Sequence, residues 1–304
     1  MVTKLIAFIR LARPHFLLGG LLLYALGAVI ARYQGYPIDL RVYAVGQLFV
    51  TSIQLMTQFL NEYWDVDTDR LNQSRTPFSG GSGMLGPGGF KRETALTAAL
   101  ACLAVATGAG AWLVIQTPIA PAALAIMVLA FLGTYFYSSP PVSLVSTGFG
   151  EAAASVLVAG LVPALGHVLQ AGQPSPLVAL ATAPLVMFHF AMLLAFEYPD
   201  FLSDEAAGKR TLLVRLGRRR GTAVLNGALF GGIALAALAS FLGLPAQVAL
   251  AVVISSPLVL LQITLIRRMQ RGEPFSFTRM TLLAILIFAL TTYFMAFSFW
   301  RLRL

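Results

Sequence analysis

The sequence predicts an all-α, polytopic membrane protein with nine transmembrane helices. Hydrophobic residues make up 58% of the chain and charged residues only 11%, whereas a typical soluble domain has about 25% charged residues. The mean hydropathy is +0.80, and apolar runs long enough to cross a bilayer as a helix recur along the chain. Lys and Arg gather in alternate connections between these runs, as they do in polytopic membrane proteins.

Nine apolar runs are the expected spans. They cover approximately residues 16–33, 41–60, 94–115, 118–137, 149–171, 177–197, 222–242, 246–266 and 280–299. The first run follows Lys4, Arg10 and Arg13 and therefore resembles a signal peptide, but no small-residue cleavage site closes it. We interpret it as a membrane span. Pro199, just after the sixth run, is expected to kink or end that helix.

The basic residues predict the topology. With the N-terminus inside, 17 of the 21 Lys and Arg residues fall in inner segments, as the positive-inside rule requires. The two long inner connections, 61–93 and 198–221, then lie on the cytoplasmic side of a cell (inner) membrane. The net charge of +9 indicates an anionic membrane surface and an anionic substrate rather than nucleic acid, because no continuous basic stripe is present. The single cysteine, Cys102, cannot form an internal disulfide.

The first long connection opens with a stripe of oxygen ligands. Asn61, Asp65 and Asp69 are spaced four residues apart, so in a helix they share one face, whereas Asp67 points elsewhere. Carboxylate oxygens suit hard cations such as Mg²⁺, which usually binds together with substrate phosphates. The alternative is a solvated helix end, but acids placed against a membrane are costly unless they are used.

The second long connection repeats this four-residue spacing of acidic residues. Asp200 and Asp204 have the same spacing, and each lies 135 residues after its counterpart in the first motif. The sequence therefore predicts two acidic clusters that face one metal-diphosphate. The repeat also suggests a single membrane-embedded domain over residues 1–304, built from two four-helix pseudo-repeats, about 1–140 and 141–270, with a closing ninth helix around a central cavity.

Basic residues accompany both acidic motifs and suit the oxygens of a phosphate group. They are Arg75 and Lys91 in the first connection and Lys209 and Arg210 in the second. The glycine-rich segment Gly80–Gly89 is able to close over a ligand and to offer backbone N–H groups to an anion.

Several further polar residues have two interpretations each. Glu151, near the fifth span, is either a functional carboxylate or a helix–helix hydrogen-bonding group. Tyr137 either faces a cationic intermediate through its ring or is an interfacial aromatic residue. His15 and His189 show no metal-ligand spacing and are weak candidates for lining a pocket, whereas Arg218–Arg220 suit lipid headgroups.

Taken together, these motifs resemble the UbiA-type intramembrane aromatic prenyltransferases. The family pattern NxxxDxxxD is present as Asn61, Asp65 and Asp69, and the second pattern, DxxxD, as Asp200 and Asp204. Further similar segments, which resemble especially the menaquinone-type 1,4-dihydroxy-2-naphthoate prenyltransferases, are Arg13-Pro14-His15-Phe16, Gly150-Glu151 and Gly208-Lys209-Arg210-Thr211-Leu212. One position departs from the family, because Phe196 stands where an Asn is often found, with Glu197 next to it.

The resemblance implies Mg²⁺-dependent transfer of an isoprenyl group from an isoprenyl diphosphate to an aromatic acceptor, through ionisation to an allylic cation. It implies metal ligation by Asp65, Asp69, Asp200, Asp204 and Asn61, a catalytic role for the four aspartates and Tyr137, and substrate binding by Asn61, Arg75, Lys91, Lys209, Arg210 and Glu197. 1,4-Dihydroxy-2-naphthoate in menaquinone biosynthesis is the expected acceptor; 4-hydroxybenzoate, chlorophyllide and a glycerol phosphate lipid are alternatives. An ion-coupled transporter is the alternative of another class, although its acids would lie near the bilayer midplane.

Overall fold

The computed structural model describes residues 2–302, and throughout this range the chain forms helices and connections without a β-strand. The helices are α1 (Val2–Ala12), α2 (Leu17–Tyr33), α3 (Leu40–Leu71), α4 (Arg92–Gln116), α5 (Pro121–Ser138), α6 (Gly150–Ser155), α7 (Val162–Ala171), α8 (Pro176–Ala206), α9 (Leu212–Phe241), α10 (Ala246–Gln270) and α11 (Phe277–Arg301). Two short 3₁₀ turns, η1 (Pro14–Phe16) and η2 (Leu144–Ser146), precede α2 and α6, and a π-helical segment, η3 (Val156–Leu161), joins α6 to α7.

The predicted all-α membrane architecture is confirmed. Among the described residues, eight helical stretches are long and apolar enough to cross a bilayer, with α6, η3 and α7 acting as one continuous stretch. The predicted span 41–60 lies in α3, which is 32 residues long and carries the polar motif at its C-terminal end. Gln47, Gln54 and Gln58 inside the apolar run lower its hydropathy, and α3 is the predicted span outside the eight.

Pro199 was expected to kink or to end its helix, and the second outcome is wrong, because α8 continues past this proline. The helix continues through Pro184 and Pro199 to Ala206. Neighbouring helices that pack on all sides stabilise such a helix despite the missing backbone hydrogen bonds; most of α8 is buried, including Tyr198 at 1% exposure. As a result, Asp200 and Asp204 lie on the last turns of one continuous helix.

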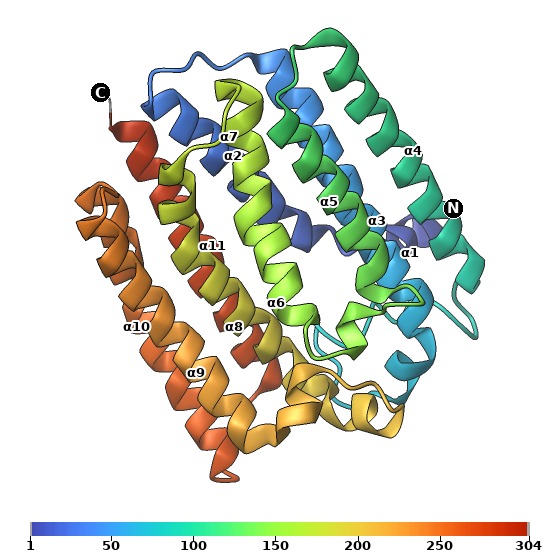
Figure 1. Ribbon diagram of the computed structural model, residues 1–304. Coiled ribbons are helices and arrows are strands. Elements are labelled where there is room, and N and C mark those ends of the chain that lie inside the picture. The colour runs from blue at the N-terminus through green and yellow to red at the C-terminus, as the bar shows by residue number, and fades with distance from the viewer. Residues whose placement is uncertain (1, 303–304) are drawn as a thin grey trace.

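The helices stand side by side in one bundle (Figure 1). Helix α8 packs against α9 and α11 in the larger core, whereas α3, α4, α5 and α7 surround a second core. The C-terminal ends of α3 and α8 and the loops that follow them lie at the same, lower end of the bundle in Figure 1. The two acidic motifs, far apart in sequence, are thereby brought to one end of the molecule.

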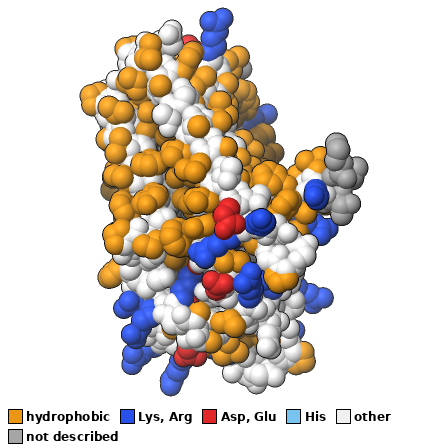
Figure 2. All heavy atoms as spheres, turned by 90° about the vertical axis from the view of Figure 1, so that its right-hand side faces the viewer, with side chains coloured by type: hydrophobic (Ala, Val, Ile, Leu, Met, Phe, Trp, Pro, Cys, Tyr) orange, Lys and Arg blue, Asp and Glu red, His pale blue; other side chains and the backbone are white. Residues whose placement is uncertain are grey.

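The outer surface is suited to lipid. Large apolar side chains are exposed around the bundle, such as Ile115, Phe241 and Leu260, which are 75%, 89% and 62% exposed. Figure 2 shows hydrophobic side chains over most of the upper part of one face, with Lys, Arg, Asp and Glu gathered in its lower half. Apolar exposure of this extent indicates a membrane-embedded surface, and the chain is a multi-pass membrane protein.

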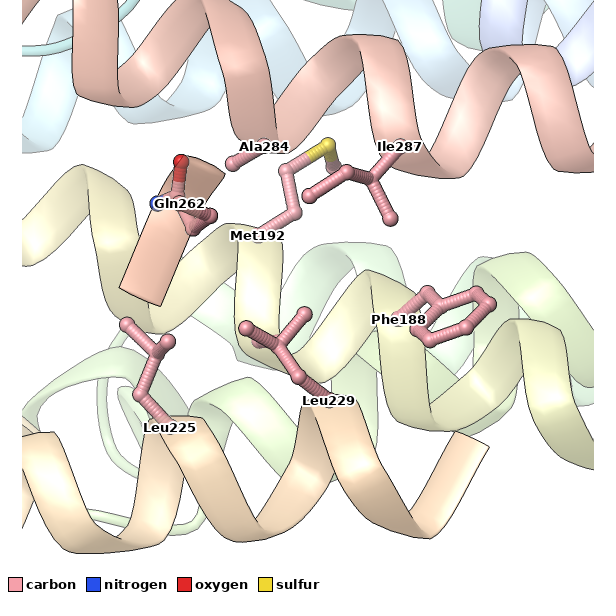
Figure 3. Close-up of a pocket in the computed structure, with 8 residues that line it drawn as sticks. Phe188, Met192, Leu225, Leu229, Gln262, Ala284 and Ile287 are labelled. Carbon is pink, nitrogen blue, oxygen red and sulfur yellow. The ribbon is translucent and has the colours of Figure 1, made fainter. Parts of the chain in front are cut away.

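One polar group is buried inside the larger core. The Gln262 side chain lies between α8, α9 and α11, near Leu225, Met192 and Ala284 (Figure 3). Its amide oxygen and nitrogen have no hydrogen-bond partner among the described residues. The gap around it has no room for a water-sized molecule, so this region is packing and not a binding site.

Candidate functional site

The main cavity has a volume of about 470 Å³ and is bordered by α2, α3, α5, α6, η3, α8 and α11. Its polar border combines the ends of α3 and α8 with the loops that follow them, and its apolar border includes Leu18, Leu157, Leu193 and Phe288. A cavity of this size and mixed lining is typical of a small-molecule site. All four predicted catalytic aspartates border it.

Helix α3 supplies one polar wall. Asn61, Asp65 and Asp69 all border the cavity, as their four-residue spacing predicts for one helical face. Asn61 accepts a hydrogen bond from the Ser138 hydroxyl through its side-chain oxygen, which fixes its amide orientation. Asp67 lies on the other side of the helix, where its side chain is 73% exposed and pairs with Arg70 at 3.2 Å.

Helix α8 supplies the facing wall through Asp200 and Asp204. Asp200 accepts hydrogen bonds from the Asn72 amide at 2.6 Å and from the backbone N–H of Gly80 at 3.2 Å. Asn72 follows the end of α3, so these bonds connect the two acidic motifs directly. Asp204 is buried at 5% exposure and forms no ion pair with a described residue.

Lys209 is one of two cationic side chains among the described residues that border the cavity, together with Arg13. Its Nζ donates a hydrogen bond to Oδ2 of Asp65 at 2.9 Å. Burial by itself lowers the pKa of Lys209, but the nearby carboxylates of Asp65 and Asp204 outweigh it, and the pKa rises above its ordinary value. The ammonium group therefore stays charged and available to an anion.

The glycine-rich loop closes over the acids at its N-terminal part. Ser79, Gly80 and Gly81 border the cavity. Gly81 has a left-handed φ of 68°, and a Cβ atom at this position would overlap the Asp69 carboxylate. Only glycine allows the backbone to approach the acid this closely.

Two buried groups hold this loop in place. Glu62 accepts hydrogen bonds from both the backbone N–H and the hydroxyl of Ser82, each at 2.6 Å. Arg13 donates to the backbone oxygen of Phe78 at 2.8 Å and lies 3.9 Å from Glu62. The N-terminal segment before α2 thereby supports a loop about 65 residues later in the chain.

Three predicted phosphate ligands lie outside the cavity border. Arg75, Lys91 and Arg210 are all exposed. Arg75 donates to the backbone oxygen of Asp69 at 2.9 Å, so it fixes the end of α3. Lys91 precedes the first residue of α4, and the backbone oxygen of Arg210 accepts from Arg215.

Other residues border the cavity without having been singled out as site residues from the sequence. Gln54 and Gln58 extend the Asn61 stripe along α3, and their spacing of seven and three residues before Asn61 was the signal that could have found them. Arg13 also borders the cavity, with only 12% of its side chain exposed. The sequence feature that could have identified Arg13 is the family-like segment Arg13-Pro14-His15-Phe16.

The third wall carries Tyr137, Glu151 and Glu197, which all border the cavity. Glu151 and Glu197 are 3% and 8% exposed. His15 and His189 border the cavity as well, and Nδ1 of His189 lies 3.1 Å from the Ser155 hydroxyl. The structure thus brings together eight of the eleven predicted site residues.

The donor set fits a hard metal ion that brings its own phosphate ligands. Among residues 2–302, no three His, Cys, Asp or Glu side chains are arranged to hold an ion by themselves. Mg²⁺ characteristically binds through one or two carboxylates together with substrate phosphates, and two acidic pairs facing one cavity meet this requirement. Burial and the neighbouring Asp65 carboxylate raise the pKa of Asp69 to about 8, which indicates excess negative charge that a cation would relieve.

The chain has relatives among known proteins. Residues 20–286 match the UbiA prenyltransferase family. The chain is 28% identical over 236 residues to a homogentisate phytyltransferase from Synechocystis sp., covering 72% of each protein. It is 24% identical over 216 residues to a 1,4-dihydroxy-2-naphthoate octaprenyltransferase from Bacillus subtilis, covering 71% of this chain and 68% of the relative.

The fold has a solved counterpart. The structure of a UbiA homologue from Archaeoglobus fulgidus, bound to DMAPP and Mg²⁺, superposes with a TM-score of 0.67 at 19% identity and covers 95% of this chain and 98% of that protein. Because the family match extends over most of the chain, this multi-pass membrane protein belongs to the UbiA prenyltransferase family and is an enzyme that transfers isoprenyl groups to acceptor molecules.

Proposed function

We propose that this enzyme transfers an isoprenyl group from an isoprenyl diphosphate to an aromatic acceptor, 1,4-dihydroxy-2-naphthoate, in a Mg²⁺-dependent reaction of menaquinone biosynthesis. The observation that carries the proposal is the meeting of the two acidic pairs at one cavity that also holds Lys209. The relationship to a 1,4-dihydroxy-2-naphthoate octaprenyltransferase supports this acceptor. The reaction takes place at the cytoplasmic side of a cell membrane, as the distribution of basic residues predicts.

The diphosphate binds between the ends of α3 and α8. Asp65, Asp69, Asp200 and Asp204, with Asn61, border this region and would hold Mg²⁺, which would supply neutralisation of the diphosphate and of the charge on its leaving oxygen. Lys209 donates hydrogen bonds to the same oxygens, and Gly81 offers its backbone N–H beside them. Arg75, Lys91 and Arg210 contribute from the exposed side as the loops close over the bound diphosphate.

The isoprenyl tail lies against the apolar border. Leu18 of α2, Leu157 of η3 and Phe288 of α11 form this surface. Tyr137 turns its ring towards the allylic cation that forms when the bond to the diphosphate oxygen breaks, since aromatic faces stabilise cations. The loop around Ser79–Gly81 excludes water, which would otherwise capture the cation.

The test is a membrane assay with a radiolabelled isoprenyl diphosphate. Membranes containing the enzyme receive 1,4-dihydroxy-2-naphthoate, homogentisate, 4-hydroxybenzoate, chlorophyllide or a glycerol phosphate lipid, each with Mg²⁺ or with EDTA. We expect labelled product with the naphthoate, and only with Mg²⁺. Transfer to another acceptor alone would overturn the acceptor assignment, and transfer that resists EDTA would overturn the metal assignment.

A further inference from the structure

The wall of the cavity that α3 forms stays polar beyond the acidic motif. Gln54, Thr57 and Gln58 precede Asn61 on this helix and border the same cavity. At a rise of 1.5 Å per residue, Gln58 lies about 10 Å further along α3 than Asp65, on the side away from the helix end. Polar side chains at membrane depth are costly unless they are used, so each of these three groups needs a hydrogen-bond partner.

The threonine finds its partners within the protein. The Thr57 hydroxyl donates to the backbone oxygen of Ile53 at 2.9 Å. The same hydroxyl lies 3.2 Å from the hydroxyl of Thr134 on α5. Thr57 is therefore a contact within α3 and between α3 and α5, and its presence in the cavity wall requires no ligand.

The Gln58 amide differs, because it forms no hydrogen bond with a described residue. The side chain is partly exposed although it points into the bundle, and neither its oxygen nor its nitrogen is among the enclosed polar atoms. Gln58 shares one helical face with Asn61 and Asp65, three and seven residues later. Its amide therefore presents both an acceptor and N–H donors to the cavity.

Gln54 lies one turn further along the same face. Its amide packs against α2 at Gly20, where a Cβ atom would overlap it, so the close approach of the two helices fixes its position. The Gln54 oxygen is enclosed and has no partner among the described residues, whereas its nitrogen is not enclosed. The group that Gln54 offers to the cavity is therefore the NH₂ donor.

Only one part of the two proposed substrates suits these open amides. The isoprenyl tail is apolar and suits the opposite border, at Leu18, Leu157 and Phe288. The diphosphate belongs at the acids, and a carboxylate suits a cationic partner better than a neutral amide. A ring hydroxyl both donates to an amide oxygen and accepts from an amide nitrogen. The separation of about 10 Å along the helix leaves room for one aromatic ring between the diphosphate and Gln58.

We propose that Gln58 binds a ring hydroxyl of the aromatic acceptor, with the Gln54 NH₂ group as a second donor, and that this contact selects hydroxylated rings. This inference rests on the proposed prenyl transfer and names the part of the cavity that positions the acceptor. A ring held against α3 in this way directs its reacting carbon towards the allylic carbon at the acidic end of the cavity. An acceptor without this hydroxyl leaves the Gln58 amide without a partner and binds more weakly.

A thermodynamic cycle between the Gln58 amide and the hydroxyl tests this contact. Dissociation constants are measured for 1,4-dihydroxy-2-naphthoate and for its two analogues that lack one hydroxyl, in the wild type and in Gln58→Leu. An unreactive isoprenyl thiolodiphosphate is present throughout, so the values report binding and not reactivity. The matched control is Gln47→Leu, because Gln47 lies on α3, donates to Thr51 at 3.1 Å and does not border the cavity.

In the wild type, we expect loss of the hydroxyl that contacts Gln58 to raise Kd about tenfold, as for a buried hydrogen bond whose partner is removed. Gln58→Leu should raise Kd for the full acceptor by a similar factor and should bind that analogue no more weakly than the full acceptor, since both changes remove the same hydrogen bond. Donor affinity should stay the same, and Gln47→Leu should match the wild type. An equal effect of the missing hydroxyl in the wild type and in folded Gln58→Leu would overturn the contact.

The wild-type series does not depend on the folding of any variant. Equal Kd values for the full acceptor and both analogues would by themselves overturn the subsite. If homogentisate proves to be the acceptor, the same cycle is run with homogentisate and its analogues that lack one hydroxyl. Failure of the proposed function looks different, because the wild-type enzyme would then transfer the label to none of the aromatic acceptors, and the subsite would fall with it.

Discussion

Lys209 and Asp65 form the ion pair that connects the two acidic halves of the site. Nζ of Lys209 lies 2.9 Å from Oδ2 of Asp65, and the side chains are only 14% and 22% exposed. Lys209 follows α8, whereas Asp65 lies on α3, so the pair joins helices that are distant in sequence. A charge pair with this little solvent is screened weakly, and it holds both groups at the position that we propose for the diphosphate.

Removal of the ammonium group should slow the departure of the diphosphate. We expect Lys209→Met to lower kcat by about 100-fold or more, as for the loss of one preorganised donor to a developing negative charge. Single-turnover assays with saturating Mg²⁺ measure this effect. Lys4→Met, which removes an exposed lysine of α1, should leave kcat unchanged. A Lys209 variant with wild-type kcat would exclude the lysine from the chemical step.

The acids of the two motifs should be needed together. We expect Asp65→Asn and Asp200→Asn each to lower Mg²⁺-dependent transfer by about 100-fold or more, because each removes charge that holds the metal on the diphosphate. The matched control is Asp67→Asn on the exposed side of α3, which should retain near wild-type activity. Comparable losses in all three variants would indicate a general effect of charge on folding rather than metal binding.

Mg²⁺ affinity should depend on pH through Asp69. Its pKa is raised to about 8 by burial and by Asp65, so below this pH the metal-free protein holds a proton that the ion must displace. Between about pH 6 and pH 8, the apparent Kd for Mg²⁺ should therefore rise as the pH falls, and should level off above pH 8. Calorimetric titration in buffers of different ionisation enthalpy measures the released proton. Asp69→Asn should reduce the slope between about pH 7 and pH 8, whereas Asp204, whose pKa burial raises to about 7, keeps a dependence at lower pH; an unchanged slope in this variant would contradict the assignment.

Gly81 should tolerate no side chain. We expect Gly81→Ala to displace the loop from Asp69, because a Cβ would overlap the carboxylate and the left-handed φ costs about 1–2 kcal/mol. Activity should fall strongly. Gly88→Ala is the control, since Gly88 also has a positive φ of 80° but has open space around it; it carries the backbone strain without the overlap. Equal losses in both variants would assign the effect to strain alone.

The sequence was sufficient for the helices and for the two motifs, because both depend on local spacing. An apolar run of about 20 residues forms a spanning helix wherever it stands, and a four-residue spacing aligns Asn61, Asp65 and Asp69 on one face of α3. The same spacing rule excluded Asp67 from this face of α3, and the Asp67 side chain is exposed in the structure. The pseudo-repeats of about 1–140 and 141–270 stay a prediction.

Contacts between distant segments were decided only by the tertiary structure. Sequence spacing does not indicate that Lys209 reaches Asp65 or that Arg13 supports the loop at Phe78. Sequence spacing also predicted Lys91 and Arg210 as phosphate-binding residues alongside Lys209, although of these three only Lys209 borders the cavity. Pro199 was expected to kink or end α8, but the helix continues beyond it to Ala206, because the neighbouring helices stabilise it.

The sequence by itself determined that this protein is a helical membrane protein with two acidic motifs, because hydropathy and helical periodicity are properties of neighbouring residues. Only the tertiary structure placed Glu151 beside Glu197 at the start of α9, where they accept hydrogen bonds from consecutive backbone N–H groups. That placement depends on how α6, α8 and α9 pack together, and packing is set by the shapes of whole helices rather than by any short stretch of sequence.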